Sequence, residues 1–274
     1  MKSRNVLMFY VLTFAICWGI AILFIVFPEP LEAAFGPMGM YNPVFILYAF
    51  MPLIIALTLS AIFEGREGVR VWLSRCFQWK VHPVWYLAIL IGVPALACLA
   101  TLLSGQTLGF DPRLVLWAIF PGLLIGPLSE EPGWRGYALP NLLKNNSLLK
   151  SGLITGILWG IWHLPAYIIA GTPQESGNPT EAFLSFGLVA IGLNLLQAWI
   201  FSRTQGSALV AGIFFHWIYN TSMELAGDPH LWMGILLVVA AAIVIVIDRE
   251  LFLNYLPNSS QGKTIRESRV TGES

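Results

Sequence analysis

Long apolar stretches separated by short polar ones dominate the chain. Most of these stretches reach the roughly 20 residues that a helix needs to cross a hydrocarbon layer about 30 Å thick. Helices are the expected form, because unpaired backbone groups cannot lie in lipid. The pattern predicts eight membrane-spanning helices, at residues 6–27, 43–63, 84–103, 114–129, 152–170, 183–202, 206–224 and 230–247.

The basic residues fall on alternate sides of this predicted topology. Of the 15 Lys and Arg residues, all but Arg113 lie before the first predicted helix, in every second connection, or in the tail. Cytoplasmic loops of membrane proteins carry such an excess of basic residues. We therefore predict that both termini face the cytoplasm, in a bacterial cytoplasmic membrane.

Composition supports a membrane protein. Hydrophobic types make up 57% of the 274 residues and charged types 11%, whereas soluble domains carry roughly 25% charged residues. The predicted fold is an all-α, polytopic transmembrane helical bundle. We expect one transmembrane domain over residues 1–256 and a polar, disordered cytoplasmic tail over 257–274. The net charge of zero argues against nucleic acid as a partner.

Few ionisable side chains lie within the predicted helices, and such groups are candidates for function because burying them in a bilayer is costly. Glu130 and Glu131 follow the fourth apolar run, His163 lies in the fifth, and His216 lies in the seventh with Asn220 one turn later. We interpret these residues as one candidate site that is shared by three helices.

The two glutamates should differ in role, because neighbouring residues on a helix point about 100° apart. Glu131 and Arg135 are four residues apart and can form an ion pair. That pair would leave Glu130 free to face the histidines.

Depth in the membrane gives a further expectation. Counted at 1.5 Å per residue, Glu130 lies about 10 Å nearer the cytoplasm than the histidines. The gap closes if the fourth helix continues beyond Arg135 or if the helices tilt. These depths suggest a cavity that opens to the cytoplasm.

Both histidines lie on stripes of small residues, which let two helix backbones approach closely. We therefore expect the histidines to face other helices and not lipid. The small residues are Gly152, Gly156 and Gly160 before His163, and Ala208 and Gly212 before His216.

Three segments resemble the motifs of a known membrane family. Residues 130–135, EEPGWR, are similar to the E-E-x-x-x-R motif of the CAAX-protease and bacteriocin-processing (CPBP) family, which includes the type II CAAX prenyl endopeptidases and abortive-infection proteins. Residues 159–163, WGIWH, resemble its F-x-x-x-H motif with Trp in the Phe position, and residues 216–220, HWIYN, resemble its H-x-x-x-N motif. The order agrees, and the motif core spans residues 114–224.

The resemblance implies an intramembrane glutamic endopeptidase that hydrolyses a membrane-associated or lipidated peptide or protein. It implies that Glu130 and His163 activate the attacking water. His216 and Asn220 would then donate hydrogen bonds to the oxyanion. The residues that would hold the motifs in shape are Glu131, Arg135 and Trp159.

A metalloprotease mechanism is the alternative within this reading. Glu130, His163 and His216 would be plausible ligands of a divalent metal such as zinc. The chain has no H-E-x-x-H motif, and Asn220 is a poor zinc ligand. We favour water activation without a metal.

Two other functions fit the same intramembrane polar groups. One is a non-catalytic bacteriocin-immunity or scaffold protein with this fold. The other is a transporter with a proton or metal relay, although the chain shows no internal repeat.

The oligomeric state stays open. Among the remaining polar residues, we expect interhelical hydrogen bonds from Asn194 and Gln197, solvated side chains at His82 and His230, and an interfacial position for Glu224.

Overall fold

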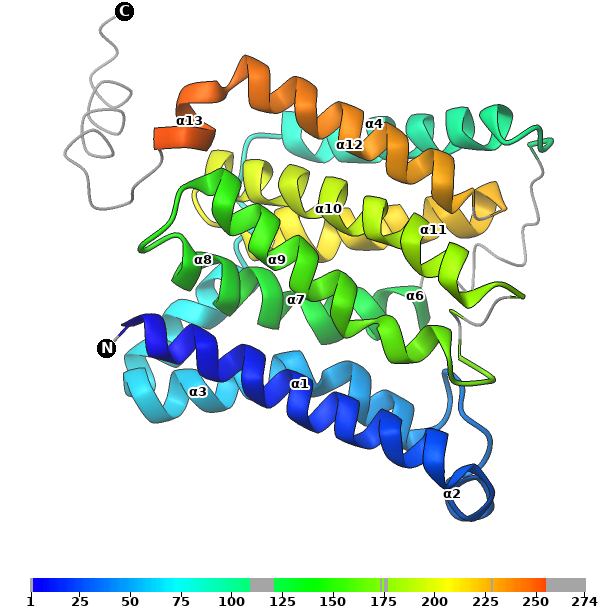
Figure 1. Cartoon of the computed structure of the whole chain (residues 1–274). Helices are drawn as coiled ribbons and strands as arrows, with labels where there is room; N and C mark the ends of the chain where they lie inside the picture. Colours follow the sequence, from blue (N-terminus) through cyan, green and yellow to red (C-terminus); the bar gives the residue numbers. More distant parts are fainter. Residues whose placement is uncertain (1, 109–120, 173, 175–176, 228, 255–274) are drawn as a thin grey trace, which may run out of the picture.

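Helices account for every regular element that the computed structural model describes, which is residues 2–108, 121–172, 174, 177–227 and 229–254. This confirms the all-α fold. Figure 1 shows the helices stacked in layers with nearly aligned axes. At one edge α1 (Lys2–Val26) packs on α3 (Pro43–Cys76), and at the other lie α4 (Val84–Leu103) and α12 (His230–Ile247).

Five of these helices are long and apolar enough to cross a membrane: α1, α3, α4, α12 and α10 (Pro179–Arg203). The bounds of α4 and α12 coincide with the third and eighth predicted spans. The chain is therefore a multi-pass membrane protein. The number of eight spans and the cytoplasmic position of the termini stay predictions.

Two further apolar runs form shorter helical segments. The fifth run gives α9 (Leu148–Trp162) and a 3-10 turn, η3 (Leu164–Tyr167). The seventh gives a π-helical turn, η4 (Leu209–Phe214), and α11 (Phe215–Ala226). Short helices also flank the bundle, namely α2 (Pro28–Phe35) and α13 (Arg249–Asn254).

The fourth run is a chain of short helical pieces, and its predicted residues 114–120 lie outside the described residues. Prolines inside these pieces remove backbone donors and disfavour a regular α-helix. The helical turns continue to Leu142, past Arg135, which is one of the two ways in which the depth gap could close. The pieces are α6 (Pro121–Leu123), η1 (Leu124–Leu128), α7 (Ser129–Gly133), η2 (Trp134–Ala138) and α8 (Leu139–Leu142).

Polar N-caps start three of the helices. Asn42 accepts hydrogen bonds from the backbone N–H groups of Val44 and Phe45, and Pro43 takes the first helical position of α3. Ser147 caps α9 and Asn178 caps α10 in the same manner. Side-chain oxygens at these positions satisfy donors that the first helical turn leaves open.

The predicted loop at 64–83 is wrong in its first half, because α3 continues to Cys76. A break in helical geometry at Gly65, with φ of 65°, marks the predicted end of the span. The residues beyond it are polar enough to leave the membrane yet still form helical turns, with Arg70 and Glu67 paired at 3.8 Å on the exposed face. Hydropathy predicts where the apolar span ends, whereas the helix itself continues to Cys76.

The two ends of the bundle differ in charge. The start of α1, the end of α10 and α13 lie at one end of the bundle, which we term the basic end. There the side chain of Gln78 donates a hydrogen bond of 2.8 Å to the carbonyl oxygen of Thr204 and so connects two loops. At the opposite end, termed the acidic end, Gly171 lies against the backbone of Met38. The basic end carries Arg75, Lys80, Lys144, Lys150, Arg203 and Arg249 beside the carboxylates Asp248 and Glu250, and the acidic end carries Glu29, Glu32, Glu181 and Glu224.

Candidate active site

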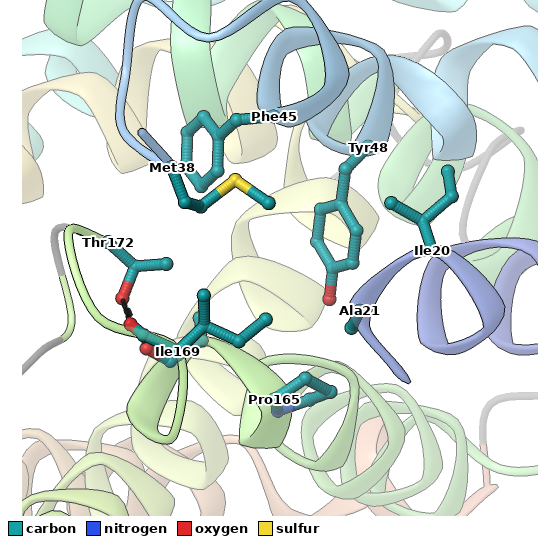
Figure 2. Close-up of a pocket in the computed structure, with 9 residues that line it drawn as sticks. Ile20, Ala21, Met38, Phe45, Tyr48, Pro165, Ile169 and Thr172 are labelled. Carbon is teal, nitrogen blue, oxygen red and sulfur yellow. Dashed lines mark hydrogen bonds between the residues drawn. The ribbon is translucent and has the colours of Figure 1, made fainter. Parts of the chain in front are cut away.

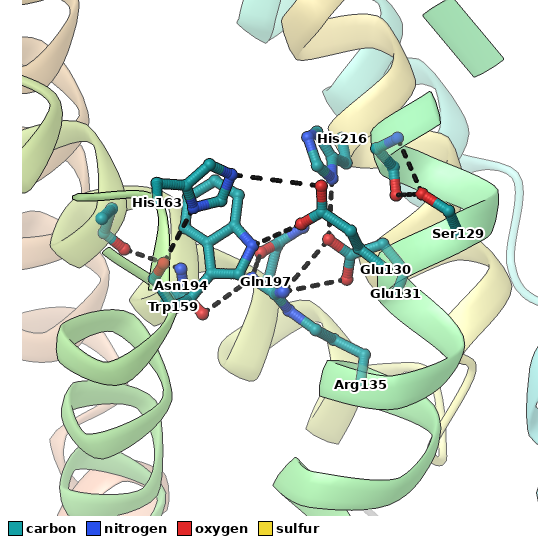
Figure 3. Close-up of polar contacts among 11 residues, drawn as sticks. Ser129, Glu130, Glu131, Arg135, Trp159, His163, Asn194, Gln197 and His216 are labelled. Atoms are coloured by element: carbon teal, nitrogen blue, oxygen red, sulfur yellow. Dashed lines mark hydrogen bonds and ion pairs between the residues drawn. The ribbon is translucent and has the colours of Figure 1, made fainter. Parts of the chain in front are cut away.

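Glu130 and His163 meet inside the bundle, as the sequence predicted (Figure 3). Glu130 lies on α7, and its Oε2 accepts a hydrogen bond of 2.7 Å from Nε1 of Trp159 on α9. Nε2 of His163 lies 4.0 Å from Oε1 of Glu130. The two side chains are 5% and 8% exposed, so the acid and the imidazole face each other at a nearly dry point.

The orientation of His163 follows from the end of α9. Its Nδ1 lies 2.8 Å from the carbonyl oxygen of Trp159, and a carbonyl only accepts hydrogen bonds. Nδ1 therefore carries the proton, and Nε2 of the neutral ring is an acceptor aimed at Glu130. Pro165 prevents the α-helix from continuing past this point.

Glu131 forms the predicted ion pair with Arg135, at 3.0 Å, and both side chains are almost completely buried. The Arg135 guanidinium also donates to Oδ1 of Asn194, at 2.7 Å, and to Oε1 of Gln197. The interhelical hydrogen bonds that we expected from Asn194 and Gln197 are thus confirmed. These contacts compensate the charge of an arginine inside the bundle.

His216 has a partner that the sequence did not reveal. Its Nδ1 lies 2.8 Å from Oε1 of Glu131, on another helix. Since Glu131 also pairs with Arg135, it is an ionised acceptor, and Nδ1 of His216 donates to it. The opposite edge of the ring, with Nε2, is therefore fixed in direction.

Gly126 is a further site residue that our sequence reasoning did not single out. Its backbone leaves helical geometry, with φ of 103° and ψ of −88°. A Cβ there would lie 3.2 Å from Nδ2 of Asn220 and 3.5 Å from Nε2 of His216. Ser129 stabilises the break, because its Oγ accepts a hydrogen bond of 2.9 Å from the Gly126 N–H. The signal in the sequence was the Gly126–Pro127 dipeptide, which is typical of a turn.

A cavity of about 390 Å³ contains the four predicted catalytic residues on its wall. Trp159 lines it beside Glu130. The residues predicted to act directly are thereby brought to one space, from α7, α9 and α11. These are Glu130, His163, His216 and Asn220.

The cavity extends to the acidic end of the bundle. Met40, Gln174, Glu224 and His230 line its outer part, and all four side chains are partly exposed. His230, which we expected to be solvated, and Glu224, which we expected to be interfacial, are thus part of the cavity wall. His82 is exposed, as expected.

We predicted that the cavity opens towards the cytoplasm. The structure places its outer part at the acidic end of the bundle, and which end faces the cytoplasm stays a prediction. The depth count placed Glu130 near the end of its apolar run. In the structure the helical turns continue to Leu142, so Glu130 lies near the middle of the segment that begins at Pro121.

A smaller apolar pocket adjoins the cavity and shares Phe45, Tyr48 and Ala166 with it (Figure 2). The end of α1, the start of α3 and η3 enclose it. The Tyr48 hydroxyl donates a hydrogen bond of 2.9 Å to the carbonyl oxygen of Trp162, which fixes the ring between the two spaces. The pocket is apolar and small, with a volume of about 20 Å³.

The arrangement of donors can be tested against a metal. Among the residues that the structure describes, no three His, Cys, Asp or Glu side chains form a group able to hold a metal ion. The predicted set of Glu130, His163 and His216 is not such a group. Nδ1 of each ring has a partner, so only Nε2 of each ring could reach a ligand in the cavity. We therefore assign no step to a metal.

Comparisons with known proteins agree on one family. A model described as Rce1-like type II CAAX prenyl endopeptidase matches residues 112–222. A curated protein named CAAX prenyl protease 2, from Methanococcus maripaludis, is 28% identical over 235 residues, which is 80% of this chain and 86% of the relative. The matched segment contains Glu130, His163, His216 and Asn220.

Proposed function

Because this chain belongs to the CPBP family of intramembrane endopeptidases, we propose that it hydrolyses a peptide bond in a membrane-associated peptide or protein. The observation that carries the proposal is the juxtaposition of Glu130 and His163 on the cavity wall. In this role the chain is a glutamic-type peptidase.

The 4.0 Å between Oε1 of Glu130 and Nε2 of His163 is too long for a direct hydrogen bond and fits one bridging water. Both atoms accept, so the water donates one hydrogen to each. Its free lone pair then faces the cavity and attacks the substrate carbonyl. Glu130 takes the proton that the water loses as the C–O bond forms.

His216 and Asn220 stabilise the negative charge that develops on the carbonyl oxygen. Glu131 holds Nδ1 of His216, and Gly126 lies against both donors, so they need no reorganisation during the reaction. When His216 donates from Nε2, both of its ring nitrogens carry a proton. Glu130 then returns its proton to the leaving nitrogen, the C–N bond breaks, and the products are a carboxylic acid, which keeps the second hydrogen of the water, and an amine.

Supporting roles follow from contacts with these groups. Trp159 holds Oε2 of Glu130, which leaves Oε1 for the water. Arg135 holds Glu131 and thereby the His216 ring. These are positioning residues.

The test is cleavage of a peptide library by the purified full chain in proteoliposomes. We expect Glu130→Gln and His163→Ala each to lower the cleavage rate about 10²–10⁴-fold, the usual contribution of a general base. Glu32→Gln, an exposed glutamate on α2, is the matched control and should retain the rate. Undiminished cleavage by the Glu130 and His163 variants would overturn the proposal, and with no cleavage by the unaltered chain the non-catalytic alternative would replace it.

A further inference from the structure

We propose that two amides of α10, Asn194 and Gln197, are positioning residues of the reaction, and that they act on the oxyanion through Arg135, Glu131 and His216. This inference rests on the proposed function. It extends the machinery of the site to a helix that carries none of the three motifs. The amides hold the Arg135 guanidinium without neutralising it, so its charge is left to Glu131.

The contacts form one continuous chain from α10 to the cavity (Figure 3). Nη2 of Arg135 donates to Oδ1 of Asn194, at 2.7 Å, and to Oε1 of Gln197. Its Nη1 donates to Oε1 of Glu131, at 3.0 Å. The same oxygen of Glu131 lies 2.8 Å from Nδ1 of His216, which lines the cavity. A shift of the guanidinium is therefore passed to the His216 ring through two hydrogen bonds.

The amide of Asn194 is fixed in orientation. Its Nδ2 donates a hydrogen bond of 2.7 Å to the carbonyl oxygen of Ala190, one turn earlier on α10. A carbonyl only accepts and a guanidinium only donates, so Oδ1 is the atom that faces Arg135. The guanidinium thus meets acceptors whose direction is set before it arrives.

The helix gives these amides a rigid base, because α10 packs closely between α9 and α12. A Cβ on Gly156 of α9 would lie 3.1 Å from Cβ of Asn194, and a Cβ on Gly192 of α10 would lie 2.7 Å from the backbone nitrogen of Val238 on α12. Asn194 and Gln197 are 2% and 0% exposed, so bulk water does not replace them as acceptors.

The demand for position is strict on the side of Glu131. Its Oε1 accepts from Arg135 and from His216 at once, so the guanidinium must stay where one oxygen can serve both donors. Arg135 also lies over the Trp159 ring, 5.7 Å from the centroid, and this contact has no directional hydrogen bond to lose. Loss of an acceptor on α10 is therefore felt mainly at His216.

The kinetic test uses Gln197→Met, which keeps the length of the side chain and removes the acceptor, and Asn194→Leu as the second variant. We expect each to lower kcat about tenfold to a hundredfold with KM unchanged, the effect of losing a hydrogen bond to a charged group in the transition state. The control is Ser202→Ala, because this hydroxyl donates to Trp199 within α10 and is partly exposed.

Two backgrounds separate positioning from a structural role. In His216→Ala the oxyanion donor is gone, so Gln197→Met should lower the rate no further. In His163→Ala it should lower the rate by its full factor. Equal fold losses in the two backgrounds would overturn the inference, because a general loosening of the bundle does not depend on which histidine is present.

A readout without substrate keeps the inference distinct from the proposed function. In the full chain with isotopically labelled histidine, the Nδ1–H resonance of His216 reports the bond to Glu131, and its loss in His216→Ala assigns it. We expect Gln197→Met and Asn194→Leu to shift this resonance and Ser202→Ala to leave it in place. If the unaltered chain cleaves peptides and neither variant shifts the resonance, the inference fails and the proposed function stands. If no peptide is cleaved, both fail.

Discussion

At the scale of single residues, Trp159 contributes a hydrogen-bond donor that the Phe of the family motif does not have. The motif it resembles has Phe at this position, and the sequence predicted only an aromatic wall. In the structure its indole N–H donates to Oε2 of Glu130, and its ring centroid lies 4.6 Å from that of His163. This donor fixes which carboxylate oxygen is left for the reaction.

We therefore expect Trp159→Phe to lower kcat/KM about tenfold to a hundredfold, because a hydrogen bond to a charged group contributes roughly 1.5–3 kcal/mol. The ring and its packing are kept, so the thermal midpoint should change little. Trp232→Phe, on the exposed face of α12, is the control. Equal kcat/KM for Trp159→Phe and the unaltered chain would show that the indole N–H has no part in positioning Glu130.

The donor set at the site gives a second prediction at this scale. With no step assigned to a metal, a chelator present during purification and assay should leave the peptidase rate unchanged. Elemental analysis of the active protein should show less than one transition metal per chain. A rate that falls on chelation and returns with Zn²⁺ would contradict water activation by Glu130 and His163 alone.

Local spacing predicted some contacts at the site and could not predict others. The Glu131–Arg135 pair follows from the i,i+4 rule, which applies within one helix. The contact between Glu131 and His216 joins residues 85 positions apart. It depends on how α7 and α11 pack, and no pattern of spacing along one chain contains that information.

At the scale of elements, the pieces from α6 to α8 act as one broken segment held against α3. The closest approach is at Gly133, where a Cβ would lie 2.6 Å from the backbone carbon and oxygen of Pro52. Pro52 is internal to α3 and cannot shift without the helix. The position of Glu130 thus depends on the absence of a side chain three residues later.

We expect Gly133→Ala to destabilise the protein by about 1–3 kcal/mol, the usual cost of overpacking, and to lower activity because α7 must move. The control is Gly92→Ala on α4, where a Cβ would meet no atom within 4 Å. Thermal unfolding in detergent measures both. A Gly133→Ala midpoint as high as that of Gly92→Ala would show that α7 and α3 are less closely packed than described.

Element type and most boundaries could be predicted because membrane helices carry a strong hydropathy signal. Two features could not. The break at Gly126 lies inside an apolar run, where composition does not distinguish a continuous helix from an interrupted one. The helical continuation of α3 to Cys76 lies outside the apolar run, where hydropathy has no bearing on helix formation.

At the scale of the whole molecule, access to the site depends on the width of the cavity near the acidic end. Ala182 lines the cavity at the start of α10 and is small. We expect Ala182→Trp to lower kcat/KM for long peptides more than for short ones, because the larger side chain narrows the approach and leaves the catalytic groups in place. Ala34→Trp, exposed on α2 at the same end, is the control. An equal effect on long and short peptides would place the route of entry elsewhere.

The end of the bundle at which the cavity opens could not be predicted from the sequence. The charge bias of the loops could be counted directly, but the depth of Glu130 depended on where its helix stops. Apolar residues alone suggested an end at 129, whereas Arg135 and the turns beyond it are buried by neighbouring helices. A polar residue that is buried against other helices does not contact lipid. Hydropathy cannot distinguish such a residue from one that lies outside the membrane in water.

The network around Arg135 also has a consequence for biogenesis. A lone arginine at the centre of a bilayer costs several kcal/mol, and two of its partners, Asn194 and Gln197, are synthesised about 60 residues later. Until α10 emerges from the ribosome, the nascent segment around Arg135 has its ion-pair partner Glu131 but lacks the two amide acceptors of α10. We therefore expect the translocon or an insertase to retain this segment until α10 arrives, so that the reactive centre assembles only once most of the polypeptide has been made.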